Sequence, residues 1–361
     1  MTTDVRVALI GYGLAGACFH APTIAATPGL SLATIVTASP LRRERAGHEH
    51  PAARVVDRVD AVFADPAGHD LVVVATPNST HVPLALAALA AGQGVVVDKP
   101  FAPTAEEARR VVAEARRRGL FLSAYHQRRW DSETLTLQRL LAEGALGDVL
   151  RFESRFERWR PVPMVGWRES DAPGGAGGLL YDLGTHLVDQ ALHLFGPVAR
   201  VYAELDRRRP GSATDDDMFL ALTHASGVRS HLWASALAGH IGPRVRALGT
   251  RAAYVKRDAD GQEAALLAGE RPDLPGWGGE PPARWGLLGV GDAVTPVRSE
   301  PGAYQRYYAG VVASLRHGAP PPVDPDDAVA GLEIIAAAQR SAAGHEIVAL
   351  RPVSRGVQAR C

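Results

Sequence analysis

The chain has 361 residues, of which 46% are hydrophobic and 22% are charged, and this composition excludes a wholly disordered protein. Its 39 basic and 39 acidic residues balance, so no bulk field favours nucleic acid or an anionic membrane as a partner. No apolar run approaches the roughly 20 residues that span a bilayer, and the start lacks a signal-peptide pattern, so we expect a cytoplasmic protein. Cys18 and Cys361 are too few for a disulfide framework or a zinc site.

The first third of the chain alternates short, near-continuous apolar runs with longer segments of helical periodicity. The predicted strands are 5–10, 31–37, 71–75, 94–98 and 121–123, and the predicted helices are 15–26, 41–50, 82–91 and 105–118. Thr104 and Glu107 have the spacing of a capping box at the start of the last helix. This alternation predicts an α/β fold in which residues 1–123 form a doubly wound parallel sheet of the Rossmann type.

Residues 124–361 have a different pattern, with strand-like runs separated by turn residues. The predicted helices are 132–143, 183–195 and 326–341, and the predicted strands are 149–159, 199–206, 218–223, 229–236, 244–249 and 252–256. Residues 269–302 are rich in Gly and Pro and predict a long loop. We therefore expect a C-terminal α+β domain, built on a large and mainly antiparallel sheet, that binds the substrate.

A glycine-rich segment follows the first predicted strand and opens the first predicted helix. Its residues, Gly11, Tyr12, Gly13, Leu14, Ala15 and Gly16, have the G-x-G-x-x-G spacing of dinucleotide-binding proteins. Gly11 permits a tight turn, Gly13 lets the backbone approach a pyrophosphate, and Gly16 lets the helix pack closely on the strand. The pyrophosphate would lie at the helix N-terminus, where unpaired N–H groups favour an anion. A glycine turn in a flavodoxin-like fold is the alternative.

The end of the second predicted strand lacks the carboxylate that binds the ribose 2′-hydroxyl in NAD sites. It carries instead the hydroxyls of Thr37 and Ser39, followed by the guanidinium groups of Arg42 and Arg43. Because guanidinium forks suit a 2′-phosphate, the segment favours NADP over NAD as the cofactor. The alternative is that both arginines are solvated residues of an exposed helical turn.

Two further strand ends should face the same crevice, because ligands of doubly wound sheets lie beyond the carboxyl ends of the strands. Thr76, Pro77, Asn78 and His81 follow one strand, and Asp98 and Lys99 end another. We expect these six residues to contact the cofactor. Lys99 is one of only two lysines among the 39 basic residues, and the other, Lys256, is expected to carry a surface or sheet-face charge.

These motifs together resemble the glucose–fructose oxidoreductase/inositol dehydrogenase (Gfo/Idh/MocA) family. The resemblance rests on the glycine segment, Ala75–Asn78 with His81, Asp98–Pro100, and the run from Tyr181 to Asp189. Residues 19–22, 126–131 and 152–161 are similar to the scyllo-inositol dehydrogenase branch. The resemblance covers nearly the whole chain, although the usual Glu-Lys-Pro is Asp98-Lys99-Pro100 here.

The resemblance implies an NAD(P)-dependent oxidoreductase that acts on a cyclitol or sugar hydroxyl, and a homodimer or homotetramer. It implies that His186 accepts the proton, that Asp182 is its partner and a substrate ligand, and that Lys99 donates to the reacting oxygen. Asp182 and His186 are four residues apart, a spacing that would place both on one face of a helix, where an Asp can hold the tautomer of a His. The blander alternative is that Asp182 caps a helix and His186 is a buried packing residue.

A polyol pocket needs fork-shaped donors for vicinal hydroxyls and an aromatic plane for a ring face. The substrate-binding candidates, beside Lys99, Asp182 and His186, are Arg128, Trp130, Arg158, Trp167, Arg168 and Tyr181. So many arginines could also favour a carboxylated or phosphorylated sugar. We expect no metal site, because His126, Asp182 and His186 lack a tight ligand pair. Other readings of the same fold are a non-catalytic dinucleotide sensor and an NAD-dependent glycoside hydrolase.

Overall fold

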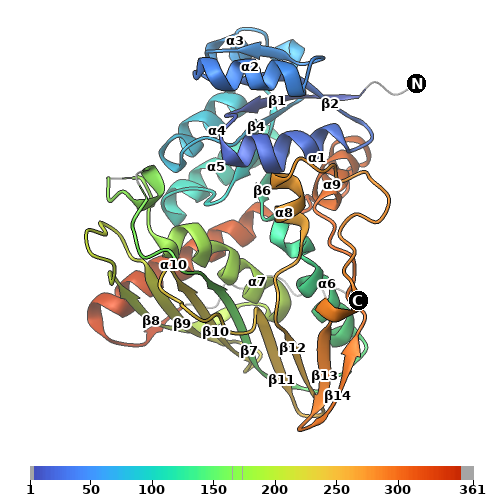
Figure 1. Ribbon diagram of the computed structural model, residues 1–361. Coiled ribbons are helices and arrows are strands. Elements are labelled where there is room, and N and C mark those ends of the chain that lie inside the picture. The colour runs from blue at the N-terminus through green and yellow to red at the C-terminus, as the bar shows by residue number, and fades with distance from the viewer. Residues whose placement is uncertain (1–3, 165, 173, 351–361) are drawn as a thin grey trace.

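A computed structural model describes residues 4–164, 166–172 and 174–350 of the chain, so that Cys361 lies outside the described residues. The described chain forms two sheets, one of six strands and one of nine, with helices α7 (Thr185–Phe195) and α10 (Pro325–Gly344) between them (Figure 1). None of its helices is both long and apolar enough to cross a membrane.

The first sheet is parallel throughout and has the strand order β3-β2-β1-β4-β5-β6. Its strands are β1 (Val5–Ile10), β2 (Leu30–Val36), β3 (Arg54–Val56), β4 (Leu71–Val74), β5 (Gly94–Asp98) and β6 (Leu122–Tyr125). The short edge strand β3 was not predicted, because three residues give too little periodicity. The boundary predicted at residue 123 falls inside β6.

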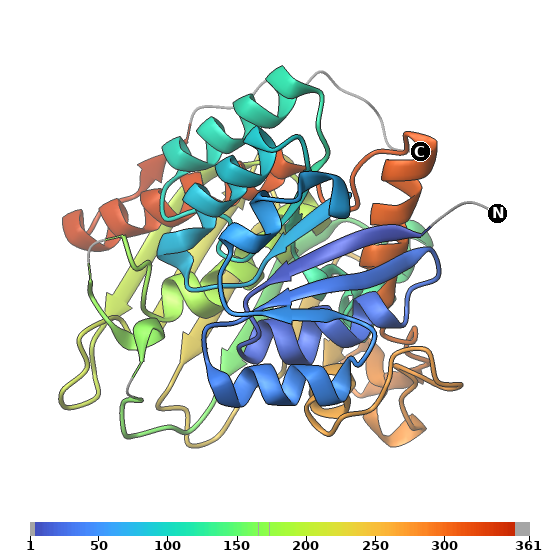
Figure 2. The same cartoon turned by 90° about the horizontal axis from the view of Figure 1, so that it is seen from above.

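Helices cover both faces of this sheet (Figure 2). They are α1 (Ala21–Ala25), α2 (Pro40–Glu49), α3 (Asp60–Phe63), α4 (His81–Ala90) and α5 (Ala105–Arg118). The valines of β4 and β5 are fully buried, which explains why these strands are apolar without alternation. The predicted cap of α5 is present, because the Oγ1 of Thr104 accepts a hydrogen bond from the N–H of Glu107 at 3.2 Å.

The first helix is not the continuous α-helix that was predicted. It begins with a π-helical segment, η1 (Ala15–His20), in which the N–H of Ala21 donates to the carbonyl of Gly16, and only then continues as α1. Pro22 has no N–H to donate to the preceding turn, which disfavours a regular α-helix at this point.

The second sheet has the order β14-β13-β12-β11-β7-β10-β9-β8-β15. Its strands are β7 (Val149–Glu157), β8 (Val198–Asp206), β9 (Asp217–His224), β10 (Arg229–Ser235), β11 (Val245–Gly249), β12 (Ala253–Lys256), β13 (Gly286–Val290), β14 (Ala293–Val297) and β15 (Val348–Ala349). Neighbouring strands are antiparallel except β7 and β10, which are parallel. Burial alternates along β9 and β10, because helices cover only one face of the sheet.

The prediction of a long loop over residues 269–302 was wrong. This region forms the hairpin of β13 and β14 after a short 3₁₀ turn, η7 (Pro282–Arg284). Gly286, Gly289 and Pro296 interrupt the strand pattern in the sequence, and β14 tolerates its proline because it lies at the sheet edge. Helix α8 (Gln262–Leu267) precedes this region and was not predicted.

The helices of the second half are α6 (Ser132–Ala142), α7, α8, α9 (Gln305–His317) and α10. Of these, α9 was also not predicted. Tyr307, Tyr308 and Val311 of α9 and Leu332 of α10 belong to the same apolar core as the first sheet. The end of the chain therefore packs back onto the cofactor half of the molecule.

Lys256 was expected to carry a surface or sheet-face charge, and the structure places it on a sheet face and not on the surface. Its side chain is fully buried on the covered face of β12, and its Nζ donates to both carboxylate oxygens of Glu280 at 2.9 and 2.7 Å. The carbonyl of Arg284 accepts a third hydrogen bond at 2.6 Å. The pattern of β12 alone does not show this, because the partner carboxylate comes from the segment beyond α8.

Substituting Lys256→Met should lower the free energy of unfolding by about 3–5 kcal/mol, because it leaves the Glu280 carboxylate buried without a cation. Urea denaturation followed by circular dichroism measures this change. The control is Arg271→Ala, which breaks the exposed ion pair with Asp273 and should leave the midpoint nearly unchanged. Equal, small shifts in both variants would show that the buried pair is dispensable.

Candidate active site

Two positions of the glycine-rich turn require glycine, Gly11 for its backbone conformation and both Gly11 and Gly16 for lack of space. Gly11 has φ of +103°, and a β-carbon on it would lie 2.3 Å from the carbonyl oxygen of Ala75. A β-carbon on Gly16 would lie 1.9 Å from the carbonyl oxygen of Gly11. The space beside Gly13 is open, since a β-carbon there would meet only the Nη1 of Arg42, at 3.8 Å. This geometry fits the backbone cradle of a pyrophosphate.

The side chains within this turn do not line the cradle together. Tyr12 is buried, and its hydroxyl donates a hydrogen bond to the carboxylate of Glu49 on α2. Leu14 is half exposed. The turn therefore offers its backbone to a ligand, while Tyr12 anchors it to the neighbouring helix.

The segment after β2 uses its two arginines differently. Ser39 caps α2 by accepting from the N–H of Arg42, at a long 3.4 Å, and Arg43 donates to the carbonyl of Ala38 at 2.8 Å. Thr37 is buried at the strand end. Arg42 is exposed and is the arginine whose guanidinium approaches Gly13. Of the two, Arg42 is therefore placed for a ligand, whereas Arg43 holds the loop.

Lys99 joins the first sheet to the second half of the chain. Its Nζ donates to the Oδ1 of Asp182 at 2.9 Å and to the carbonyl oxygen of the same residue at 2.6 Å. Asp182 lies in a π-helical turn, η6 (Leu180–Gly184), that leads into α7. Burial raises the pKa of the Asp182 carboxyl, but Lys99 and the nearby Arg168 and Arg158 hold it below its usual value.

Asp98 braces the backbone of this lysine. One carboxylate oxygen of Asp98 accepts the N–H of Lys99 at 2.8 Å, and the other lies 3.9 Å from the Nε2 of buried His20. The other ring nitrogen of His20 lies 2.6 Å from the hydroxyl of Tyr308 on α9. Burial raises the pKa of Asp98, but His20, Lys99 and His81 lower it further than burial raises it. Asp98 therefore stays ionised and positions Lys99.

His186, in the first turn of α7, is only 5% exposed. Its Nδ1 has no hydrogen-bond partner in the described part of the chain. Burial, followed by the charges of Lys99 and Arg128, lowers the pKa of His186 well below its ordinary value. The imidazole is therefore neutral at neutral pH.

The expected pairing of Asp182 with His186 is not present. The Asp182 carboxylate contacts Lys99, with Arg158 and Arg168 at 3.7 Å, and makes no hydrogen bond to His186 among the described residues. A charge-assisted bond to the lysine is stronger than one to a neutral imidazole. Helical spacing could not reveal this competitor, which is 83 residues away in the sequence.

Asn78 and His81 hold protein segments together with their side chains. The Nδ2 of Asn78 donates to the carbonyls of Gly175 and Ala176, at 3.2 and 3.1 Å, and thereby links the first sheet to the loop before η6. The ring nitrogens of buried His81 lie 2.8 and 2.9 Å from the carbonyls of Pro100 and Thr76. His81 thus sets the path of the loops around Lys99 and is not open to a ligand.

Three aromatic candidates do not gather around Asp182. Trp130 packs against Tyr307 of the core, with ring centroids 5.8 Å apart. The hydroxyl of Tyr181 donates to the carbonyl of Pro103 at 3.0 Å. Trp167 is partly exposed and lies under the guanidinium of Arg168.

The family models match both halves of the chain. A model described as an oxidoreductase family with an NAD-binding Rossmann fold matches residues 5–126, and the GFO/IDH/MocA C-terminal domain matches residues 134–255. The chain belongs to the Gfo/Idh/MocA oxidoreductase family. Its first domain is the NAD-binding Rossmann domain of that family, and the predicted family is confirmed.

Relatives of this Gfo/Idh/MocA oxidoreductase match nearly its whole length. The uncharacterized oxidoreductase YdgJ of Escherichia coli is 42% identical over 93% of this chain and 95% of its own. The scyllo-inositol 2-dehydrogenase (NADP(+)) IolW of Bacillus subtilis is 35% identical over 93% of each chain. The solved structure of an oxidoreductase from Yersinia pestis is 40% identical, covers 98% of this chain and 99% of its own, and superposes with a TM-score of 0.90.

The structure adds two residues to the site that were not among the candidates. Phe156 on β7 has its ring centroid 6.2 Å from that of His186, and the guanidinium carbons of Arg128 and Arg244 lie 4.7 and 3.8 Å from the same centroid. Glu263 on α8 forms an ion pair with Arg128. Phe156 is two residues before Arg158, a spacing that places both side chains on one face of an extended chain and could have revealed it. Glu263 gave no such signal, because α8 was not predicted.

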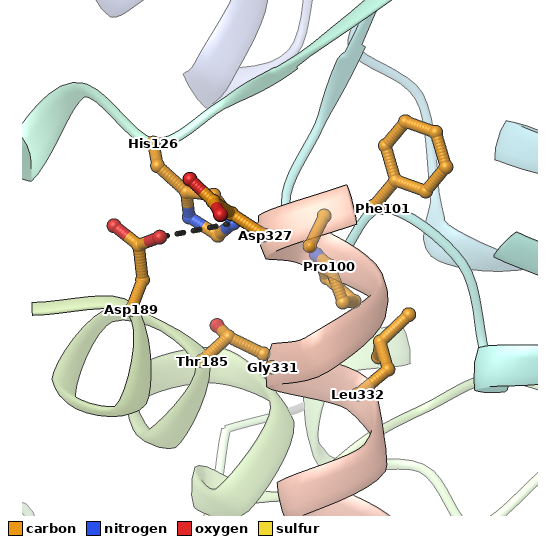
Figure 3. Close-up of a pocket in the computed structure, with 9 residues that line it drawn as sticks. Pro100, Phe101, His126, Thr185, Asp189, Asp327, Gly331 and Leu332 are labelled. Carbon is orange, nitrogen blue, oxygen red and sulfur yellow. Dashed lines mark ion pairs between the residues drawn. The ribbon is translucent and has the colours of Figure 1, made fainter. Parts of the chain in front are cut away.

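A small pocket lies behind the site, between α7, α10 and the loop after Lys99 (Figure 3). His126, Asp189 and Asp327 face one another at one end of it, and the Nε2 of His126 lies 3.9 Å from the Oδ1 of Asp189. Arg129 donates to Asp189 at 2.6 Å and to Asp327 at 3.0 Å. Asp189 therefore forms a buried salt bridge with Arg129.

The imidazole of His186 should titrate well below pH 6.5, because burial and the surrounding cations oppose its protonation. Carbon-13 NMR of protein labelled at histidine measures this, with His186→Gln to assign the signal. Arg128→Gln should raise the pKa by removing one cation. A pKa of His186 at or above 6.5 would contradict the electrostatics described.

Proposed function

We propose that the protein transfers hydride between NADP(H) and a secondary hydroxyl or ketone of a cyclitol or sugar. The observation that carries the proposal is the Lys99–Asp182 pair, which joins the cofactor domain to the helix that bears a neutral, buried His186. The name of IolW, a scyllo-inositol 2-dehydrogenase that uses NADP+, supports the same substrate class.

The dinucleotide would be held by the backbone of Gly11–Gly16, with Arg42 beside the turn to receive a 2′-phosphate. When bound, the nicotinamide accepts hydride from the carbinol carbon, or returns it to a ketone. The absence of a carboxylate after β2 supports NADP, because an acid there would repel the extra phosphate.

Side chains of the protein accept the hydroxyl proton and orient the reacting oxygen. In the oxidising direction the neutral imidazole of His186 takes the hydroxyl proton as the C–H bond breaks. The Nζ of Lys99 donates a hydrogen bond to the reacting oxygen, in place of one that it now gives to Asp182. Asp182 keeps this ammonium in place and accepts from a neighbouring substrate hydroxyl.

The surroundings of His186 support its role as a base. The side chain is almost fully buried, and the ring of Phe156 lies on one side of it, so water has little access. In such surroundings electrostatic interactions are stronger than in water. Burial and the nearby cations disfavour the positive charge of the imidazolium formed in the reaction, so His186 readily passes the proton on.

Replacing Lys99→Met or His186→Ala should lower kcat by about 10²–10⁴-fold, the contribution usual for a positioned proton-transfer group. Steady-state absorbance of the reduced cofactor with inositols and aldoses measures the rate. Circular dichroism and cofactor binding confirm that each variant is folded. Near wild-type kcat in both folded variants would remove these residues from the chemistry.

Arg42→Ala should weaken NADP by roughly 10–100-fold and NAD by less than about threefold, because a guanidinium–phosphate bond is charge-assisted. Fluorescence titration with each reduced cofactor gives the two dissociation constants. Arg58→Ala, which removes an exposed arginine paired with Asp60, is the matched control. An equal loss for both cofactors would exclude a 2′-phosphate contact at Arg42.

A further inference from the structure

Two arginines flank Asp182 without binding it closely. The Nη2 of Arg158, directly after β7, lies 3.7 Å from the Oδ2 of Asp182, and the Nε of Arg168 lies 3.7 Å from the Oδ1. Both distances exceed those of hydrogen bonds. Over residues 4–164, 166–172 and 174–350, neither guanidinium donates a hydrogen bond to the protein. Their donors are therefore free for a ligand.

The other arginines near the site each donate at least one side-chain hydrogen bond to the protein. Arg128 donates to Glu263, Arg129 to Asp189, Arg209 to Asp216, and Arg244 to Ser154 and the carbonyl of Arg155. The Nε atoms of Arg128 and Arg244 are buried without a partner, as is that of Arg158. Arg158 and Arg168 therefore differ from their neighbours in making no side-chain hydrogen bond at all, at the place where a substrate would bind.

The charges around Asp182 do not balance. Lys99, Arg158 and Arg168 share this one carboxylate, and the ionised Asp98 offsets one of the three charges from the side of Lys99. Glu263 pairs with Arg128, and Glu169 shares Arg209 with Asp216, so neither carboxylate forms an ion pair with Arg158 or Arg168 in the described part of the chain.

The surplus charge is partly removed from water. The Arg158 side chain is 33% exposed, and its Nε is buried without a hydrogen-bond partner. Burial and the charge of Arg160 lower the pKa of Arg158. A half-buried guanidinium without an acceptor destabilises the protein, and an anion bound beside it reverses that cost.

We propose that Arg158 and Arg168 bind an anionic oxygen group of the substrate, so that the enzyme acts on a polyol acid, carrying a carboxylate or a phosphate beside the reacting carbon. This inference rests on the proposed oxidoreductase function and names the substrate class of that site. Hydroxyl groups of a neutral sugar satisfy the donors of the two forks, but only an anion also neutralises their charge. Both guanidinium groups lie beside the Asp182 carboxylate, which binds Lys99, and Lys99 donates to the reacting oxygen. The anion therefore lies next to the carbon that reacts.

The test compares matched neutral and acidic polyols on the NADP-loaded enzyme. The pairs are D-glucitol with D-gluconate, D-glucose with D-glucuronate, and myo-inositol with its 1-phosphate, which also separates carboxylates from phosphates. We expect kcat/KM to be at least about 10-fold higher for the acid of at least one pair. Its KM should rise with sodium chloride, whereas that of the neutral partner should not.

Variants locate the effect. Arg168→Gln and Arg158→Gln should each lower kcat/KM for the acid by about 10-fold or more, and that for the neutral partner by less than about threefold. Arg58→Gln is the control, because it removes an exposed arginine of the first domain that pairs with Asp60. Equal losses on acid and neutral substrates, or an equal effect of Arg58→Gln, would overturn the proposal.

The outcomes separate the two proposals. Turnover of neutral polyols with no preference for acids overturns the anion site and leaves the oxidoreductase function standing. If calorimetry shows that an acid binds, that Arg168→Gln abolishes this binding, and that no polyol is turned over, the anion site stands and the proposed reaction is overturned. Failure of every acid in the panel to bind overturns the inference.

Discussion

The bond between the Lys99 ammonium and Asp182 is the interaction on which the site depends. It connects the carboxyl end of β5, where a dinucleotide would lie, to the helix that carries His186 in the other half of the chain. Asp98, His20 and Tyr308 brace the lysine from one side, and the π-helical turn presents Asp182 from the other. The residues proposed for proton transfer therefore come from both halves of the chain.

Electrostatics around this bond assign different protonation states to neighbouring groups. Lys99, Arg168 and Arg158 keep Asp182 ionised, whereas burial, followed by the charges of Lys99 and Arg128, keeps His186 neutral. Such separation of pKa values within one site is typical of acid–base chemistry. Arg158 and Arg168 make no side-chain hydrogen bond to the described residues, and under the two proposals the same charge distribution would serve both the reaction and its selectivity.

Much of the first domain follows from local sequence, because buried parallel strands such as β4 and β5 are apolar throughout and the glycine turn has a fixed spacing. The partners of individual side chains do not follow, since they come from distant segments. Helical spacing predicted a pair of Asp182 with His186, but the Asp182 carboxylate binds Lys99. The pattern of β12 did not indicate that Glu280 forms an ion pair with Lys256. The β13–β14 hairpin was not predicted either, because glycines and a proline interrupt its strand pattern.

A double-mutant cycle on kcat/KM with Lys99→Met and Asp182→Asn tests the central claim most directly. If the two residues act as one unit, the double variant should lose no more activity than the more severe single variant. Fold-losses that multiply in the double variant would contradict the account, because they would show that the lysine and the carboxylate act independently.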